Sequence, residues 1–188
     1  MSLENKLDTI FNLYLQHGNE DYIGESLSQT NHMIQAAMLA EDELQGPEIV
    51  LAALFHDIGQ LVKKTEQIGN FGNKNHEKIG YDFLINTGFT YPIPDLVFNH
   101  VKAKRYLTYK YPEYQSNLTL ASQQTLLAQG GPMTQFEAEE FESDPLFQNS
   151  LKIRNYDDNA KDPDKIVKDI NYFRTLCYNF MVQSELSS

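Results

Sequence analysis

Cysteine is nearly absent from the chain: Cys177 is the single one in 188 residues. One cysteine excludes an internal disulfide and fits a reducing compartment. The longest apolar run that we find, Ile49–Phe55, is far shorter than the roughly 20 residues that cross a bilayer. The first residues have neither the basic start nor the apolar stretch of a signal peptide. We therefore expect a cytoplasmic protein that does not bind membranes.

Positive charge is scarce as well. The chain has 15 Lys and Arg against 26 Asp and Glu, a formal net charge of -11. Such a balance opposes long-range attraction to nucleic acid, so we expect no nucleic-acid partner. A local cationic pocket for a small anion is still compatible with it. The one dense basic patch, Lys102-Ala103-Lys104-Arg105, fits either such a pocket or a solvated helix end.

Repeats, low-complexity tracts and linkers are lacking, and the length suits one domain with its own core. We therefore expect a single domain over residues 1–188. No stretch shows sustained alternation of apolar and polar residues between hairpin turns, whereas helical periodicity is widespread, which predicts an all-α fold. Helices are expected over about residues 5–17, 27–44, 49–61, 76–86, 95–105, 118–128, 151–160 and 162–183, with a short one after Thr134 and a loop over 69–74.

Four of the five histidines, His32, His56, His76 and His100, fall in separate predicted helices. The fifth, His17, ends the first helix beside Gly18, where a capping or solvated role fits better. Imidazole and carboxylate ligands suit iron, manganese or zinc, and the lack of thiolates argues against an iron–sulfur site. Independent structural roles for four such histidines are improbable, so the pattern predicts a metal site.

The pair His56-Asp57 directly follows the apolar run and is expected inside a buried helix. A charged aspartate is rarely buried without a partner or a metal. A carboxylate also has two oxygens and can bridge two ions. We therefore expect His56 and Asp57 to lie at the centre of the metal site.

A resemblance to a known family makes the expectation more specific. The set His32, His56, Asp57, His76, His100 and Asp157 resembles the ligands of the HD-domain superfamily, whose fold is a helical bundle. The segment Ile153–Lys161, with Tyr156 directly before Asp157, is similar to the diiron oxygenase branch, which includes the inositol and organophosphonate oxygenases. Asp21–Glu25, His100–Leu107 and Gln129–Met133 extend the likeness to the glycine-forming 2-amino-1-hydroxyethylphosphonate dioxygenases.

The resemblance implies two iron ions in the Fe(II)/Fe(III) state and O2 as co-substrate. It implies one iron held by His32, His56, Asp57 and Asp157, and a second held by His76, His100 and the bridging Asp57. The implied reaction is O2-dependent cleavage of the C–P bond of a small 1-hydroxyphosphonate. The example is 2-amino-1-hydroxyethylphosphonate, which gives glycine and phosphate.

The same resemblance implies the groups that contact the substrate. Tyr22 would guard the open metal position, Glu25 would meet an amino group, and Lys104 with Ser122 and Gln129 would hold the phosphonate. Of these, Tyr22, Glu25 and Lys104 would be the catalytic set. A lysine and a hydroxyl suit a phosphonate dianion, and a carboxylate suits an ammonium group.

Gln60 departs from the family, which has a histidine there in the substrate pocket. A glutamine keeps a neutral hydrogen-bond donor but cannot become a cation near neutral pH. The substituent of the substrate therefore stays open. Two other functions are compatible with the ligand set, an HD-type phosphohydrolase and a non-catalytic metal-binding protein. We expect a monomer or a weak homo-oligomer.

Overall fold

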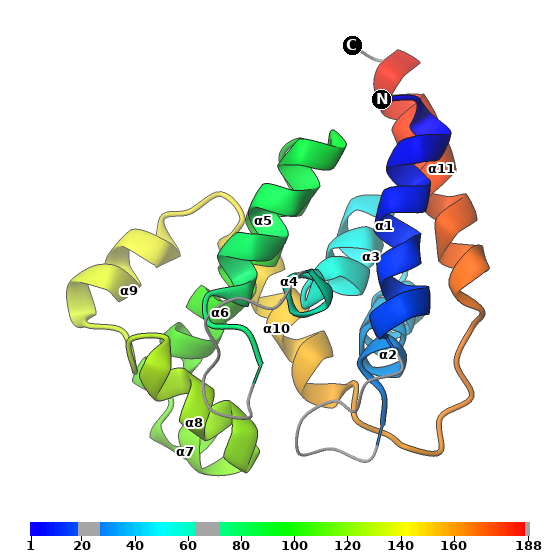
Figure 1. Cartoon of the computed structure of the whole chain (residues 1–188). Coiled ribbons are helices and arrows are strands. Elements are labelled where there is room, and N and C mark those ends of the chain that lie inside the picture. Colours follow the sequence, from blue (N-terminus) through cyan, green and yellow to red (C-terminus); the bar gives the residue numbers. More distant parts are fainter. Residues whose placement is uncertain (19–26, 63–71, 187–188) are drawn as a thin grey trace.

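The computed structural model describes residues 1–18, 27–62 and 72–186 (Figure 1). These residues form helices and their connections, which confirms the predicted all-α fold. None of the described helices is long and apolar enough to cross a membrane. The helices are α1 (Leu3–His17), α2 (Gln29–Asp42), α3 (Pro47–Phe55), α4 (Ile58–Leu61), α5 (His76–Thr87), α6 (Ile93–Lys110), α7 (Pro112–Asn117), α8 (Leu120–Ala128), α9 (Gln135–Glu142), α10 (Phe147–Asn159) and α11 (Ile170–Leu186).

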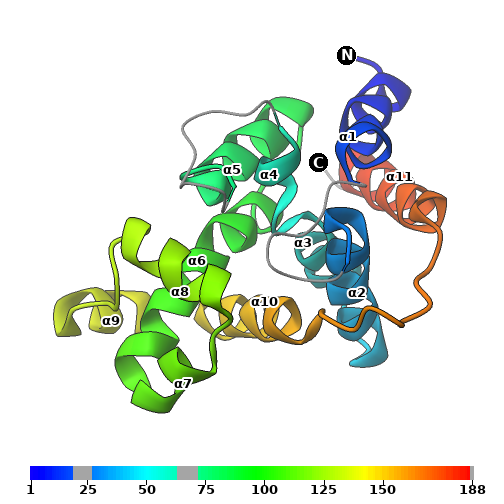
Figure 2. The same cartoon turned by 60° about the horizontal axis from the view of Figure 1, so that its bottom comes forward.

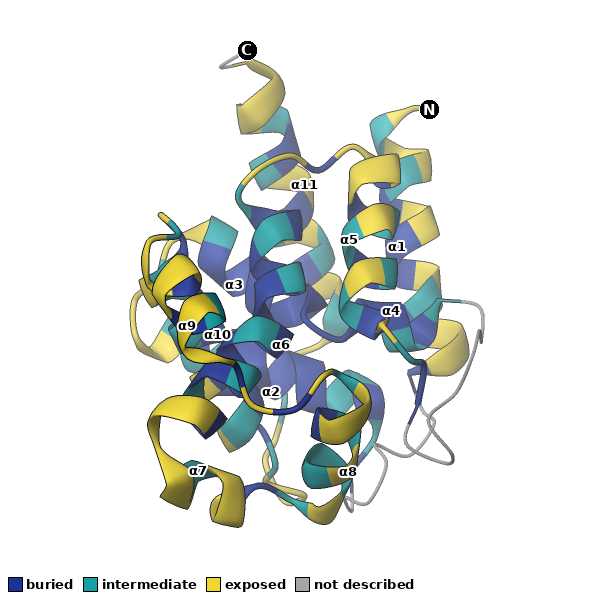
Figure 3. Cartoon of the chain, turned by 90° about the vertical axis from the view of Figure 1, so that its left-hand side faces the viewer, coloured by how far each residue is buried: buried dark blue, intermediate teal, exposed yellow. Residues whose placement is uncertain are grey.

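Helix α3 lies at the centre of the bundle and contacts α2, α6, α10 and α11. Helices α1 and α11 lie side by side, and α1 begins at the end of the molecule where α11 ends (Figure 1). Helices α7, α8 and α9 lie on the other side of the bundle (Figure 2). Burial is concentrated in α2, α3 and α6, whereas α7 is largely exposed (Figure 3).

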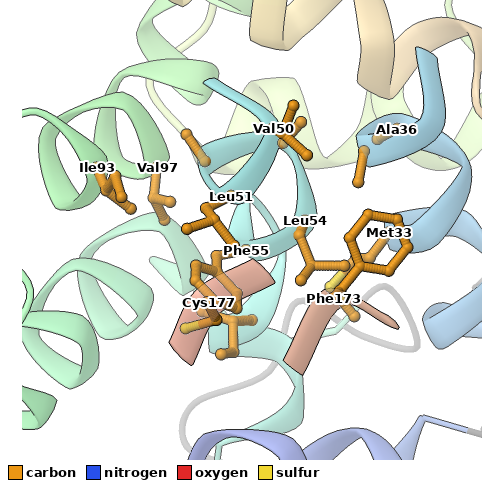
Figure 4. Packing of buried hydrophobic residues seen from close by; sticks show 14 of the residues in the cluster. Met33, Ala36, Val50, Leu51, Leu54, Phe55, Ile93, Val97, Phe173 and Cys177 are labelled. Atoms are coloured by element: carbon orange, nitrogen blue, oxygen red, sulfur yellow. The ribbon is translucent and has the colours of Figure 1, made fainter. Parts of the chain in front are cut away.

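The apolar run of the sequence becomes the core of α3. Leu51 lies toward Val97 of α6, and Leu54 lies toward Phe173 of α11 (Figure 4). Phe55 is also fully buried. Burial of one such side chain contributes about 1.5–3 kcal/mol, so the core fixes the position of the residues that follow α3.

The helix predicted over residues 49–61 is wrong in one respect, because it breaks at His56-Asp57. Asp57 has φ -106° and ψ 14°, and the chain turns there from α3 into α4. At Gly59 an added Cβ would lie 2.0 Å from the carbonyl oxygen of His76. Only a glycine permits this approach of α4 to the first turn of α5. His56 and Asp57 therefore lie at a helix junction rather than inside a helix.

The start of the last helix was also predicted wrongly. Asp162-Pro163 does not open it, because α11 begins at Ile170. The Gln35 amide of α2 holds Asp162 in place: its Oε1 accepts from the Asp162 N–H at 3.1 Å and its Nε2 donates to the Asp162 carbonyl at 2.8 Å. Asp169 Oδ1 accepts the Asn171 N–H at 2.8 Å beside the first turn of α11.

The other predicted helices are present, although their first and last residues differ from those predicted. The capping box of Thr134 and Glu137 is present at the start of α9, as predicted. Helix α6 runs on to Lys110, and α7 was not predicted. Residues 69–71 of the predicted loop lie outside the described residues, and residues 72–74 are not helical, as predicted.

Candidate metal centre

Two groups of buried ligand-type side chains share one residue. His32, His56 and Asp57 form one group, and Asp57, His76 and His100 form the other, with the possible ligand atoms of each within 4.8 Å of one another. His32 comes from α2, His76 from the first position of α5 and His100 from α6. Four segments that are distant in the sequence therefore meet at Asp57.

The two carboxylate oxygens of Asp57 face different histidines. Oδ2 lies 3.8 Å from His56 Nε2. Oδ1 lies 3.2 Å from His76 Nε2 and 3.6 Å from His100 Nε2. This is the arrangement that a carboxylate needs in order to bridge two metal ions.

Main-chain carbonyls fix the proton on three of the four rings. His32 Nδ1 lies 2.9 Å from the Ala160 oxygen, and His56 Nδ1 lies 2.7 Å from the Ala53 oxygen. His100 Nδ1 lies 2.5 Å from the Val97 oxygen. A carbonyl oxygen only accepts, so each Nδ1 carries the hydrogen and each neutral ring presents its lone pair at Nε2. Metal-binding histidines are commonly oriented in this way.

The resulting lone pairs converge. His32 Nε2 and His56 Nε2 lie 3.0 Å apart, and His76 Nε2 and His100 Nε2 lie 3.2 Å apart. Burial lowers the pKa of His56, and burial with the nearby His76 lowers the pKa of His100 to about 3. These two rings are therefore neutral at pH 7, and a cation between the facing nitrogens would stabilise the pairs. The donor set fits a bound metal ion in each group.

Asp157 joins the first group from α10. Its Oδ1 lies 3.3 Å from His32 Nε2, while its Oδ2 accepts from Arg154 Nη1 at 2.6 Å. Burial acts to raise the pKa of Asp157, but Arg154 and His32 outweigh burial and hold it well below its usual range. Asp158 instead bonds to Arg154 and Tyr114. Of the two aspartates, Asp157 is therefore the one whose carboxylate lies beside His32.

Sequence reasoning gave no role to two residues that support this centre. Arg154 is buried and precedes Asp157 by three positions, a spacing that could have indicated the pair. Glu77 Oε2 is buried without a hydrogen-bond partner in the described part of the chain and lies 3.8 Å from His76 Nδ1. Burial acts to lower the pKa of His76, but Asp57 outweighs it and the pKa is raised.

A pocket opens over the ligand groups and is lined by Gln29, Asp57, Gln60, His76, His100, Lys104, Ala121, Ser122, Thr125, Arg154 and Asp157. Lys104 is buried, and its ammonium donates to Thr125 Oγ1 at 3.1 Å. Burial, together with the charge of Arg154, lowers the pKa of Lys104 to about 7. An anionic ligand in this pocket would stabilise the charged form of the lysine. Gln29 and Thr125 were not singled out from the sequence.

Gln60, where the resemblance leads us to expect a histidine, has a fixed orientation. Its Oε1 accepts the Asn73 N–H at 2.7 Å. A backbone N–H only donates, so the amide oxygen is committed to Asn73 and the NH2 group is the part of the amide left to contact a ligand. Gln60 can therefore donate to an anion at any pH near neutrality.

The other predicted contact residues have mixed placements. Ser122 lines the pocket from α8. Gln129 is the C-cap of α8 and is not among the pocket-lining residues; its amide is buried without a hydrogen-bond partner in residues 1–18, 27–62 and 72–186. Tyr22 and Glu25 lie outside the described residues. Their roles stay predictions.

The basic patch is not a solvated helix end, because α6 continues past it. Its three cations have separate environments. Lys104 enters the pocket, and Lys102 Nζ lies 5.1 Å from the centre of the Phe98 ring. Arg105 pairs with Glu137 at 2.8 Å. Of the two interpretations of the patch, the cationic pocket for a small anion therefore applies to Lys104.

The geometry agrees with the family comparison, in which the HD domain model matches residues 30–173. The chain belongs to the HD-domain family. It is 51% identical over 181 residues to the uncharacterized protein L432 of Acanthamoeba polyphaga mimivirus. The alignment covers 95% of this chain and 83% of the relative.

Two further relatives have named activities. The [1-hydroxy-2-(trimethylamino)ethyl]phosphonate dioxygenase (glycine-betaine-forming) of Leisingera caerulea is 36% identical over 174 residues, with 90% of this chain and 87% of the relative covered. The hydroxymethylphosphonate dioxygenase of Gimesia maris is 35% identical over 173 residues, with 90% and 85% covered.

Proposed function

We propose that this protein is a diiron dioxygenase that cleaves the C–P bond of a small 1-hydroxyphosphonate. The observation that carries the proposal is the position of Asp57, whose Oδ2 faces His56 while its Oδ1 faces His76 and His100. Asp57 lines a pocket that Lys104 also lines. Two relatives that align with most of the chain are named as phosphonate dioxygenases.

The proposed metal ligands follow from the two groups. His32, His56, Asp57 and Asp157 would hold one iron, and Asp57, His76 and His100 would hold the other. Nitrogen and carboxylate ligands suit iron, and bound iron would supply the activation of O2 that the organic side chains cannot.

The pocket supplies groups for the anionic end of the substrate. Lys104 would pair with the phosphonate, since an anion offsets the cost of burying its charge. The Gln60 NH2 group and the Ser122 hydroxyl would add neutral hydrogen bonds. These contacts would hold the C1 carbon over the metal ligands and reduce the entropy cost of the reaction.

The proposed reaction balances without another reductant. For 2-amino-1-hydroxyethylphosphonate, the substrate and one O2 give glycine and one inorganic phosphate. The C–P bond breaks, C1 is oxidised to a carboxyl group, and O2 is reduced as both of its atoms enter the products.

The test is phosphate release by anaerobically iron-loaded protein, with and without O2. Three substrates should be compared: 2-amino-1-hydroxyethylphosphonate, its trimethylated analogue and hydroxymethylphosphonate. We expect release from at least one of them in air, with O2 consumed in about equal amount, and none in an anaerobic chamber. Equal release without O2 would favour the phosphohydrolase alternative, and no turnover of any phosphonate would favour a non-catalytic protein.

A matched pair of variants separates the site from the scaffold. Asp57→Ala removes the shared ligand and should abolish O2-dependent release. Asp42→Ala changes an exposed aspartate in the last turn of α2 and should leave release unchanged. Loss of activity in both would show that the assay reports stability rather than the site.

A further inference from the structure

Gln29 is a polar residue of the pocket with no role in the ligand set. It is the first residue of α2, directly after the N-cap Ser28, and is 8% exposed. It precedes His32 by three positions, so both side chains lie on the same face of the helix. Gln29 also lines the pocket that contains Asp57, His76 and His100.

The amide oxygen of Gln29 lacks a hydrogen-bond partner in the described part of the chain, although it is buried. A buried acceptor without a partner costs folding free energy, and such groups in a binding pocket are commonly satisfied by the ligand. The helix has its own cap, because Ser28 Oγ accepts the Asn31 N–H at 3.2 Å. Gln29 is therefore not needed to cap α2.

The other polar groups of the pocket are donors or are already committed. Lys104 donates to Thr125, whose hydroxyl in turn donates to the Ser122 carbonyl at 3.2 Å. The amide oxygen of Gln60 accepts the Asn73 N–H, so its NH2 group is the part that can donate to a ligand. The carboxylates of Asp57 and Asp157 face histidines and Arg154. A ligand that matches this pocket has an anionic end for the donors and a hydrogen-bond donor for Gln29.

Helix α2, which carries Gln29, and α8, which carries Ser122, lie on opposite sides of α10 (Figure 2). Gln29 and Ser122 line the same pocket, which is also lined by four of the proposed metal ligands, Asp57, His76, His100 and Asp157. The phosphonate of a small ligand would lie toward Lys104 and Ser122, and its other end would lie toward Gln29.

We propose that Gln29 determines specificity by accepting a hydrogen bond from an N–H on the substituent of the phosphonate substrate. This inference rests on the proposed function and narrows its substrate class to phosphonates with a donor-bearing substituent, such as a primary ammonium group. A trimethylammonium group has no N–H and cannot make this bond.

The test is anaerobic calorimetry of the iron-loaded protein, which measures binding without turnover. Two ligands are compared: 2-amino-1-hydroxyethylphosphonate and its trimethylated analogue. Gln29→Met keeps the length of the side chain and removes the acceptor. We expect it to weaken binding of the primary amine about tenfold and to change binding of the trimethylated analogue less than about twofold. Gln29→Glu restores an acceptor and should recover the preference for the primary amine.

Equal weakening of both ligands, or of neither, would overturn the role of Gln29 and leave the proposed function standing. Equal weakening of both ligands would mean that the Gln29 amide bonds to a water molecule or to the protein rather than to the substituent. Failure of the wild type to bind either phosphonate would overturn this inference and the proposed function together. Iron content and urea unfolding of each variant show whether it is intact, and Gln29→Ala carries the same comparison if the methionine variant does not fold.

Discussion

His32 and His56 present their Nε2 atoms to each other at 3.0 Å, while a main-chain carbonyl lies at hydrogen-bond distance from each Nδ1. With both Nδ1 atoms protonated, two lone pairs face each other across this short distance. The arrangement is stable only with a cation or a proton between them, and burial disfavours protonation of His56. The helices therefore hold these rings in a geometry suited to a metal ion.

Removal of the shared carboxylate should disrupt both groups. We expect Asp57→Ala, loaded with iron anaerobically and desalted, to retain one ion per chain or none, because each group loses a ligand and the bridge is gone. Elemental analysis checks this. Asp42→Ala is the control and should match the wild type. Two tightly held ions in the Asp57 variant would show that the ligand assignment is wrong.

Arg154 should stabilise the fold through its buried ion pair with Asp157. Arg154→Met leaves that carboxylate and Asp158 without their cation, so the free energy of unfolding should fall by about 3 kcal/mol. Urea denaturation of the metal-free protein measures it. The control is Arg174→Met, which breaks surface pairs with Glu4 and Asp8 and should cost less than about 1 kcal/mol. Similar losses in both variants would contradict the special role of Arg154.

The metal-free protein should lose stability as the pH falls below about 6.5. The pKa of His100 is about 3 in the folded state, so between these values the unfolded chain binds more protons and is favoured. His56 acts in the same direction, and the carboxylates of Asp57 and Asp157 add to the loss only at lower pH. The pKa of His76 is raised in the folded state, so its protonation stabilises the folded protein at pH values below 6.5. This contribution to the free energy of unfolding is lost as the pH rises above 6.5.

From pH 6.5 to pH 5, His100 alone should account for about 2 kcal/mol of the loss. Urea denaturation at the two pH values measures the change, and His100→Gln should reduce it. An unchanged pH dependence in the His100 variant would refute the buried neutral ring.

Binding of a phosphonate should return a proton to Lys104. Its pKa of about 7 leaves the side chain mostly neutral at pH 8, and a bound anion should raise that value. Anaerobic calorimetry at pH 8 in buffers of different ionisation enthalpy should show uptake of about one proton. Lys104→Met should abolish the uptake and weaken binding at least about tenfold. Lys110→Met, on the exposed part of α6, should change neither quantity.

The sequence was informative where a pattern is local. Apolar periodicity located α1, and the capping box located the start of α9. Four histidines in separate helices predicted a metal site, and the structure brings His32, His56, His76 and His100 together around Asp57. These signals depend on spacing within a helix, which the sequence contains directly.

The errors occurred where distant contacts decide the local structure. The break at His56-Asp57 accompanies the close approach of Gly59 to His76, and no proline marks it. The non-helical segment after α10 is held by the bonds between Gln35 and Asp162, which are 127 positions apart. The pocket roles of Gln29, Thr125 and Arg154 were missed for the same reason, because their surroundings come from other helices.

The most direct test of the proposed diiron centre is a crystal structure of the anaerobically iron-loaded protein with anomalous scattering measured at the iron edge. The proposed diiron centre should give two iron peaks per chain, with the Asp57 carboxylate between them, His32, His56 and Asp157 around one, and His76 and His100 around the other. A single peak, or two peaks that Asp57 does not join, would contradict it.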